Sequence, residues 1–137
     1  RERTPLPQTA DVSFVVTAQD STDTGLRLSN DAGEEVLIAV SGDRRELSID
    51  RRNSRLGASP PGYAERHVAP LRASAQVPVR VVFDRTIVEV FALDGEVVMT
   101  ERLWPTMPFS HVEWIGGRRP ASGATRLMSL RPAVRPR

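Results

Sequence analysis

Carboxylates placed beside arginines are the residues of this sequence whose types and spacing could support chemistry. Asp50 precedes Arg51, and Asp84 precedes Arg85 shortly before Glu89. Further acidic candidates are Asp94, Glu96, Glu101 and Glu113. Two carboxylates that flank a glycosidic bond can hydrolyse it, whereas charged donors and acceptors in fixed geometry can bind the hydroxyls of a sugar. A hydrolytic site and a sugar-binding site are therefore the two readings to separate.

Other kinds of site have less support in the sequence. Nucleophilic catalysis is disfavoured because there is no Cys, no Gly-x-Ser-x-Gly motif, and only His67 and His111, which we expect to be strand-surface or interstrand residues. The acidic cluster at 31–35 lacks the alternating oxygen ligands of a calcium loop, so a plain hairpin loop is favoured there. No Gly-rich loop opens a helix as phosphate binding requires. We expect no metal and no cofactor.

Length and charge limit the partners. The 137 residues fit one domain with its own core, and 19 basic and 17 acidic residues, interspersed, give a net charge of +2. This mixture argues against a nucleic-acid surface. No apolar run approaches the roughly 18 residues of a membrane span, so no membrane partner is expected. Because Arg1 stands in place of an initiator Met, we expect a fragment or a processed product.

The elements that must position the candidate residues are strands. A central meander is expected over 79–83, 86–92 and 96–102, which are rich in Val, Ile, Phe and Thr. Turns at Asp84-Arg85 and Asp94-Gly95 separate these strands, and Asp-Gly is a strong signal for a two-residue hairpin turn. The second turn places Glu89 opposite Thr100. A two-residue turn at Asp84-Arg85 would likewise place Arg80 opposite Glu89.

The rest of the chain also predicts short strands. They are expected over 13–19, 25–30, 35–41, 46–50, 109–115 and 124–130, with a Gly-, Pro- and Ser-rich surface loop at 53–65 and no helical periodicity. The expected organisation is a linker or strap at 1–12, a β-sandwich module at 13–134 and a tail at 135–137. The fold class is therefore all-β, a two-sheet antiparallel sandwich of the jelly-roll or concanavalin-like kind.

Three stretches carry a family resemblance. FDRTIVEVFALDGEVVMTERLWP, together with ELSIDRRNSR and RHVAPL upstream, resembles the C-terminal β-sandwich module of glycoside hydrolase family 32, the invertases, inulinases and levanases. The likeness covers about 13–132. Leu93 stands where the family often has Asn before Asp-Gly, and Thr86-Ile87 replaces its usual small polar pair.

The resemblance implies that this chain alone is not catalytic. In that family the catalytic carboxylates lie in an N-terminal five-bladed β-propeller, within Asn-Asp-Pro, Arg-Asp-Pro and Glu-Cys motifs, and none of these motifs occurs here. It implies a parent β-fructosidase, with a propeller catalytic domain as partner. We also expect a secreted, extracellular enzyme.

The resemblance extends to carbohydrate-binding modules of family 66, which recognise the terminal fructose of levan or inulin. It implies a fructan or fructose-oligosaccharide partner, bound by Asp50, Arg51 and Glu89 as paired charges on neighbouring strands, with Asp84 as a weaker candidate. Tyr63 or Trp104 would supply the aromatic wall.

Structural roles compete with each of these assignments. Trp104 fits an interface with a propeller, within an apolar patch of Trp104, Pro105, Met107, Pro108 and Phe109 that one small sandwich can hardly bury. Trp114 fits the core, and Glu89 could pair with Arg80 across the hairpin. We therefore interpret the chain as a module that binds terminal β-fructose, with a purely structural module that stabilises a propeller as the alternative. Levan, inulin and sucrose remain open as substrates.

Overall fold

Buried and exposed side chains alternate along the strands, and this alternation separates an inner face from an outer one. In β2 (Thr9–Thr17), Ala10, Val12, Phe14 and Val16 are buried, whereas the residues between them are only half-buried. Successive side chains of a strand point to opposite faces, so each sheet turns one apolar face to the core.

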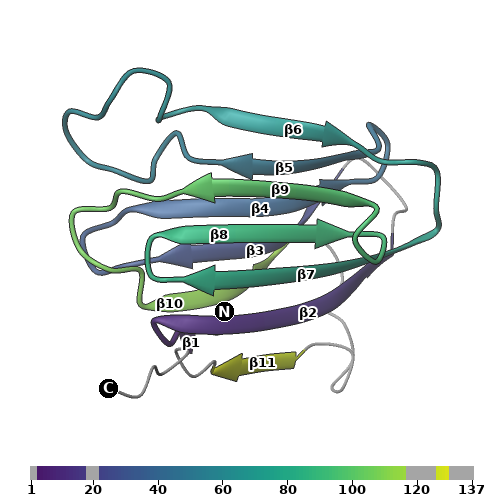
Figure 1. The fold of residues 1–137 in the computed structure, drawn as a ribbon, viewed down its shortest axis with the longest axis horizontal. Helices are drawn as coiled ribbons and strands as arrows, with labels where there is room; N and C mark the ends of the chain where they lie inside the picture. The colour runs from purple at the N-terminus through teal and green to yellow at the C-terminus, as the bar shows by residue number, and fades with distance from the viewer. Residues whose placement is uncertain (1–2, 18–21, 117–125, 130–137) are drawn as a thin grey trace, which may run out of the picture.

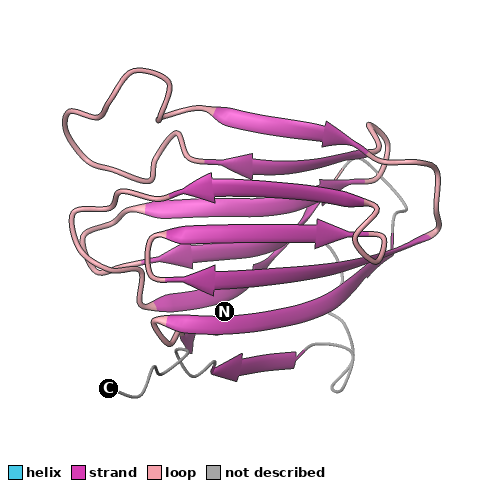
Figure 2. Cartoon of the chain, in the orientation of Figure 1, coloured by secondary structure: helices cyan, strands magenta, loops and turns pink. Residues whose placement is uncertain are grey.

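Two antiparallel sheets pack face to face in the computed structural model, which describes residues 3–17, 22–116 and 126–129 (Figure 1). One sheet has the order β1 (Thr4–Pro5), β10 (His111–Ile115), β3 (Asp23–Ser29), β4 (Glu35–Ser41), β5 (Glu46–Asp50) and β6 (Arg66–Pro70). The other has the order β11 (Arg126–Ser129), β2, β7 (Gln76–Asp84), β8 (Ile87–Ala92) and β9 (Val97–Arg102). Figure 2 shows only strands and loops in the described part of the chain. The predicted all-β sandwich is confirmed.

The register of the central meander agrees with the sequence in one hairpin and not in the other. Glu89 lies opposite Thr100, as the Asp94-Gly95 turn predicts, and Gly95 has a φ of 88°. In the β7–β8 hairpin, however, Glu89 lies opposite Val82 and Arg80 lies opposite Phe91. The predicted Arg80–Glu89 pair is therefore wrong.

Contacts from outside the hairpin account for that difference. Asp84 pairs with Ile87, so the turn residues are Arg85 and Thr86. The Arg85 amide donates to the Gln8 carbonyl at 2.7 Å, and the Thr86 carbonyl accepts from the Leu103 amide at 2.6 Å. Arg85 takes a φ of 56°, which is uncommon for a residue other than glycine and is held here by these bonds.

The N-terminal segment belongs to the sandwich over much of its length. Thr4 pairs with Val112 of β10, Leu6 is buried, and β2 begins at Thr9. The expected linker at 1–12 is thus partly sheet, and strand addition gives the physical reason, because β10 offers Thr4 and Pro5 a free edge. The expected tail at 135–137 lies outside the described residues.

The core lies between the sheets. Its largest fully buried apolar side chains are Phe83, Phe109, Leu28, Ile38, Leu47, Ile49 and Leu103. Trp114 packs against this core edge-on to Phe14, with ring centroids 5.4 Å apart, as expected. Gly25 is required where β3 meets β4, since a Cβ there would lie 2.0 Å from the Ile38 carbonyl oxygen. No helix in the described part of the chain is long and apolar enough to span a membrane.

Candidate functional site

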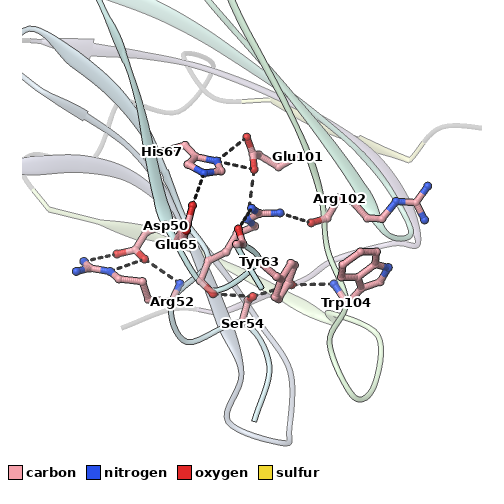
Figure 3. A network of polar contacts seen from close by, with 11 residues as sticks. Asp50, Arg52, Ser54, Tyr63, Glu65, His67, Glu101, Arg102 and Trp104 are labelled. Atoms are coloured by element: carbon pink, nitrogen blue, oxygen red, sulfur yellow. Dashed lines mark hydrogen bonds and ion pairs between the residues drawn. The ribbon is translucent and has the colours of Figure 1, made fainter. Parts of the chain in front are cut away.

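The predicted sugar-binding residues do not form one cluster. Asp50, Arg51, Tyr63 and Trp104 lie together where the long loop after β5 meets the end of β9 (Figure 3). Glu89 lies on the outer face of the other sheet, in β8, where the Thr100 hydroxyl reaches it at 3.5 Å. The expectation that Arg51 and Glu89 sit on neighbouring strands is therefore wrong. Asp84 is exposed at the end of β7.

Arg51 is a buried side chain that follows β5 of one sheet and contacts β9 of the other. It is only 7% exposed, its Nε lies 3.2 Å from Glu101 Oε1, and its two terminal nitrogens donate to the Arg102 carbonyl at 2.9 Å and the Gly62 carbonyl at 3.3 Å. The guanidinium also lies 4.7 Å from the centroid of the Tyr63 ring. All three guanidinium nitrogens thus face protein partners, and this geometry gives Arg51 an internal role.

His67 in β6 also contacts Glu101 of β9, so the two sheets are linked at this edge by a second side chain. Its Nδ1 lies 3.0 Å from Glu101 Oε1 and its Nε2 lies 3.0 Å from Glu65 Oε1 (Figure 3). Hydrogen bonds to Glu65 and then to Glu101 raise the pKa of His67, which favours the imidazolium. The expectation that His67 is an interstrand residue is confirmed.

Asp50 forms an ion pair with Arg52, two residues further along the chain. Its Oδ1 accepts from Arg52 Nε at 3.0 Å and its Oδ2 accepts from Arg52 Nη2 at 2.8 Å (Figure 3). The side-chain hydrogen bond from Arg52 lowers the pKa of Asp50. This fork-like pair lies at the surface, where such pairs contribute little to stability.

Tyr63 supports Trp104 and is not itself a wall. Tyr63 is 2% exposed, its hydroxyl accepts from the Trp104 amide at 2.8 Å, and that hydroxyl lies 2.7 Å from Ser54 Oγ. The two rings are 5.3 Å apart between centroids. Trp104, by contrast, is 38% exposed, so it is the aromatic residue that a ligand or a partner can reach.

A groove opens beside Trp104 at one end of the sandwich. Its volume is about 630 Å³, and its lining residues are Gln8, Arg55, Ala58, Ser59, Pro60, Phe83, Arg85, Thr86, Trp104, Pro105, Thr106, Met107, Pro108 and Phe109. We call this cavity the groove. Loops 51–65 and 103–110 and the β7–β8 turn meet at this end, at the left of Figure 1.

The predicted apolar patch forms part of the groove. Met107 is 43% exposed, and Pro108 is exposed as well. Phe109 differs from the expectation because it is 2% exposed and belongs to the core. The sequence did not predict three of the lining residues, Arg55, Arg85 and Gln8. Arg55 nevertheless lies in the predicted Gly-, Pro- and Ser-rich surface loop at 53–65, and such loops often carry function.

Glu34 is a further residue that the sequence did not single out. It is fully buried between β3 and β4, where the expected plain hairpin loop is confirmed by the Gly33 amide bonding to the Asn30 carbonyl. Glu34 Oε1 accepts from Asn30 Nδ2 at 2.9 Å and from the Thr106 amide at 2.8 Å, and Oε2 accepts from the Leu56 amide at 2.8 Å. The carboxylate thus ties three loops together.

The pKa of Glu34 reflects two opposed effects. Burial raises it, but the hydrogen bonds from Asn30, Leu56 and Thr106 together outweigh burial and lower it below its ordinary value. Glu34 is therefore ionised at neutral pH. Across the described residues, no group of three or more His, Cys, Asp or Glu side chains is arranged to hold a metal ion.

Comparisons with known proteins agree with the fold. The model of the family described as "Glycosyl hydrolases family 32 C terminal" matches residues 4–128. An exo-inulinase from Aspergillus awamori is 22% identical with a TM-score of 0.74, covering 83% of this chain and 23% of that one. A sucrose-6-phosphate hydrolase from Lactobacillus gasseri is 19% identical with a TM-score of 0.70, covering 96% and 28%.

A third solved structure is also similar to this chain. A β-fructofuranosidase from Schwanniomyces occidentalis, complexed with fructosyl-erythritol, is 14% identical with a TM-score of 0.63, covering 81% of this chain and 26% of that one. This chain therefore spans about a quarter of the length of the structures that it matches.

Proposed function

Because the chain belongs to the family of glycosyl hydrolase family 32 C-terminal domains, we propose that it is the non-catalytic module of a fructan-active enzyme of the levanase or inulinase type, and that it docks on the catalytic domain through the groove. The occupant we propose is the N-terminal β-propeller domain of the same enzyme. Docking would stabilise both domains, since each would bury apolar surface against the other.

The observation that carries this proposal is the exposed apolar surface around Trp104 and Met107. These side chains are 38% and 43% exposed at the mouth of a cavity of about 630 Å³. Aromatic residues, Met and Arg are the side chains enriched at protein interfaces, and here Arg55 and Arg85 stand in the same lining. A domain of the same enzyme would cover this surface.

Internal pairing of the acidic residues supports a non-catalytic role. Glu34 is fully buried and Glu101 binds Arg51 and His67 within the protein. A glycosidase needs two carboxylates that face a sugar from opposite sides. These two carboxylates instead hold loops and sheets in place.

Binding of terminal β-fructose is the second candidate, and one observation favours it. Trp104 presents an exposed ring on a fixed support, and Arg55 beside it is held by the Ala58 carbonyl at 2.8 Å and the Trp104 carbonyl at 3.0 Å. An aromatic wall with nearby hydrogen-bond donors is typical of sugar sites. On this candidate, the fructose of levan, inulin or sucrose would lie on Trp104, away from the buried guanidinium of Arg51.

The full-length enzyme tests the docking proposal. We expect Trp104→Ala and Met107→Asp to lower the temperature at which the catalytic domain loses activity, because the interface is weakened. The matched control is Val98→Ser, since Val98 is 50% exposed in β9 and does not line the groove. Equal temperatures for all variants and the wild type would contradict docking through the groove.

Titration of this chain with levan oligosaccharides, inulin oligosaccharides and sucrose tests the second candidate. Binding that Trp104→Ala abolishes would support a sugar site at the groove. Binding that Glu89→Gln abolishes would instead support the outer face of β8, the position that the family resemblance suggests. Absence of binding at millimolar sugar would leave docking as the function.

A further inference from the structure

Glu34 is a buried charge that has no counter-ion. Its side chain is fully buried, and no arginine or histidine among the described residues forms an ion pair with it. A buried carboxylate is costly unless hydrogen bonds satisfy it. Three N–H groups, from Asn30, Leu56 and Thr106, do so at 2.8 to 2.9 Å.

Two of these donors connect Glu34 to two loops that line the groove. Leu56 follows Arg55, a lining residue of the loop after β5. Thr106 is itself a lining residue of the loop after β9. Asn30 Nδ2 also donates to the Met107 carbonyl at 2.8 Å, which holds the loop after β9 at another point. One carboxylate therefore binds two loops that are far apart in the sequence, in addition to the bonds that Arg55 and Tyr63 make to Trp104.

We propose that Glu34 is the positioning residue of the groove, which it holds open in the form that the catalytic domain binds. The claim that the catalytic domain binds this open form rests on the proposed docking function. The claim that Glu34 holds the groove open does not. A preformed surface binds more tightly, because fewer loops are ordered on association. Glutamine cannot replace Glu34, since its NH₂ group would face an N–H donor on one side of the site.

Amide hydrogen exchange of this chain, measured by NMR, tests the positioning without any partner. In Glu34→Gln we expect the Leu56 and Thr106 amides to exchange at least about tenfold faster relative to the Ile38 and Ile49 amides of β4 and β5. Glu35→Gln is the matched control, because Glu35 is the next carboxylate and pairs with Arg27 away from the groove. Unchanged relative exchange at Leu56 and Thr106 would overturn the proposal.

Docking is then measured in the full-length enzyme, by the temperature at which catalytic activity is lost. We expect Glu34→Gln to lower it as much as Trp104→Ala does. Val12→Ala, which leaves a cavity in the core at a residue that does not line the groove, separates positioning from plain destabilisation, because we expect it to destabilise the module without raising the relative exchange at Leu56 and Thr106. If Trp104→Ala lowers the temperature and Glu34→Gln does not, the positioning role in docking is overturned.

Two further outcomes are also decisive. If Trp104→Ala itself has no effect, the docking function fails, while the exchange result still decides whether Glu34 holds the groove. If Glu34→Gln does not fold, Asn30→Ser removes the amide that donates to Glu34 and to the Met107 carbonyl, together with the acceptor of the Ala32 and Glu34 amides, but leaves the Leu56 and Thr106 amides beside the carboxylate. We then expect faster exchange at Thr106, because its amide donates to the same Glu34 Oε1 that loses the Asn30 donor, and unchanged exchange there would overturn the proposal.

Discussion

Arg51 and Glu101 link the two sheets of the sandwich through a nearly buried ion pair. Arg51 follows β5 of one sheet, Glu101 lies in β9 of the other, and the Nε–Oε1 distance is 3.2 Å. The two side chains are only 9% and 12% exposed. Water therefore screens this contact far less than the surface pairs of the same molecule.

Breaking this pair is expected to destabilise the fold. Glu101→Gln leaves the Arg51 charge without its carboxylate, so the free energy of unfolding should fall by about 3 kcal/mol. Urea denaturation measures it. Arg44→Gln is the control, because Arg44 pairs with Asp23 at the surface with both side chains more than 40% exposed, and it should cost less than about 1 kcal/mol. Equal losses of unfolding free energy in Glu101→Gln and Arg44→Gln would contradict the buried, stabilising role of the Arg51–Glu101 pair.

His67 makes the stability of the fold decrease as the pH rises above about 6.5. Its pKa is raised by Glu65 and Glu101, so its contribution is fully present below the unfolded pKa of about 6.5 and is lost as the pH rises through the folded pKa. Thermal unfolding from about pH 6 to pH 9 should show this decline. It should disappear in His67→Gln, and a decline of equal size in that variant would rule out His67 as its origin.

The contribution of Glu34 to stability should have the opposite dependence on pH, because it is lost in acid. Because its folded pKa is lowered, its contribution is present above the unfolded value of 4.5 and is lost as the pH falls through the folded pKa. Asp50, whose pKa is also lowered, adds to the same acid window. Denaturation at decreasing pH should therefore give a shallower acid loss in Glu34→Gln than in the wild type, and identical slopes would contradict this origin.

The Tyr63 hydroxyl is expected to anchor Trp104. Tyr63→Phe removes the acceptor of the Trp104 amide and the partner of Ser54, so the free energy of unfolding should fall by about 1 to 2 kcal/mol. Trp104 should also gain mobility, visible as lower fluorescence anisotropy. A variant with wild-type stability and anisotropy would show that ring packing alone holds Trp104.

Catalytic activity is not expected from this chain by itself. The sequence lacks the motifs that carry the family's catalytic carboxylates, and its own buried carboxylates bind protein groups. We therefore expect no release of fructose from sucrose, inulin or levan above a buffer control. Fructose release that increases with the concentration of the purified chain would refute this.

Local sequence patterns predicted the structure correctly wherever the contacts that determine it are close in the sequence. The polar and Gly-containing turns that flank the apolar runs of β4 and β5 predicted the bounds of these strands, 35–41 and 46–50, and Asp94-Gly95 predicted the β8–β9 register. A strand's side-chain period and the φ preference of glycine are properties of a few adjacent residues. The family likeness rests on the same stretches.

Contacts between distant residues decided the rest. Gln8 and Leu103 set the β7–β8 turn, and the strand order assigned Glu89 to a different sheet from Arg51. Glu34 acts on Leu56 and Thr106, which only the packed loops bring to it. No local pattern encodes such contacts, because a side chain's partner depends on which segments the whole core brings together. The sequence by itself therefore determined the strands and the family, and the tertiary structure decided which charged side chains are buried and where exposed apolar side chains line a groove.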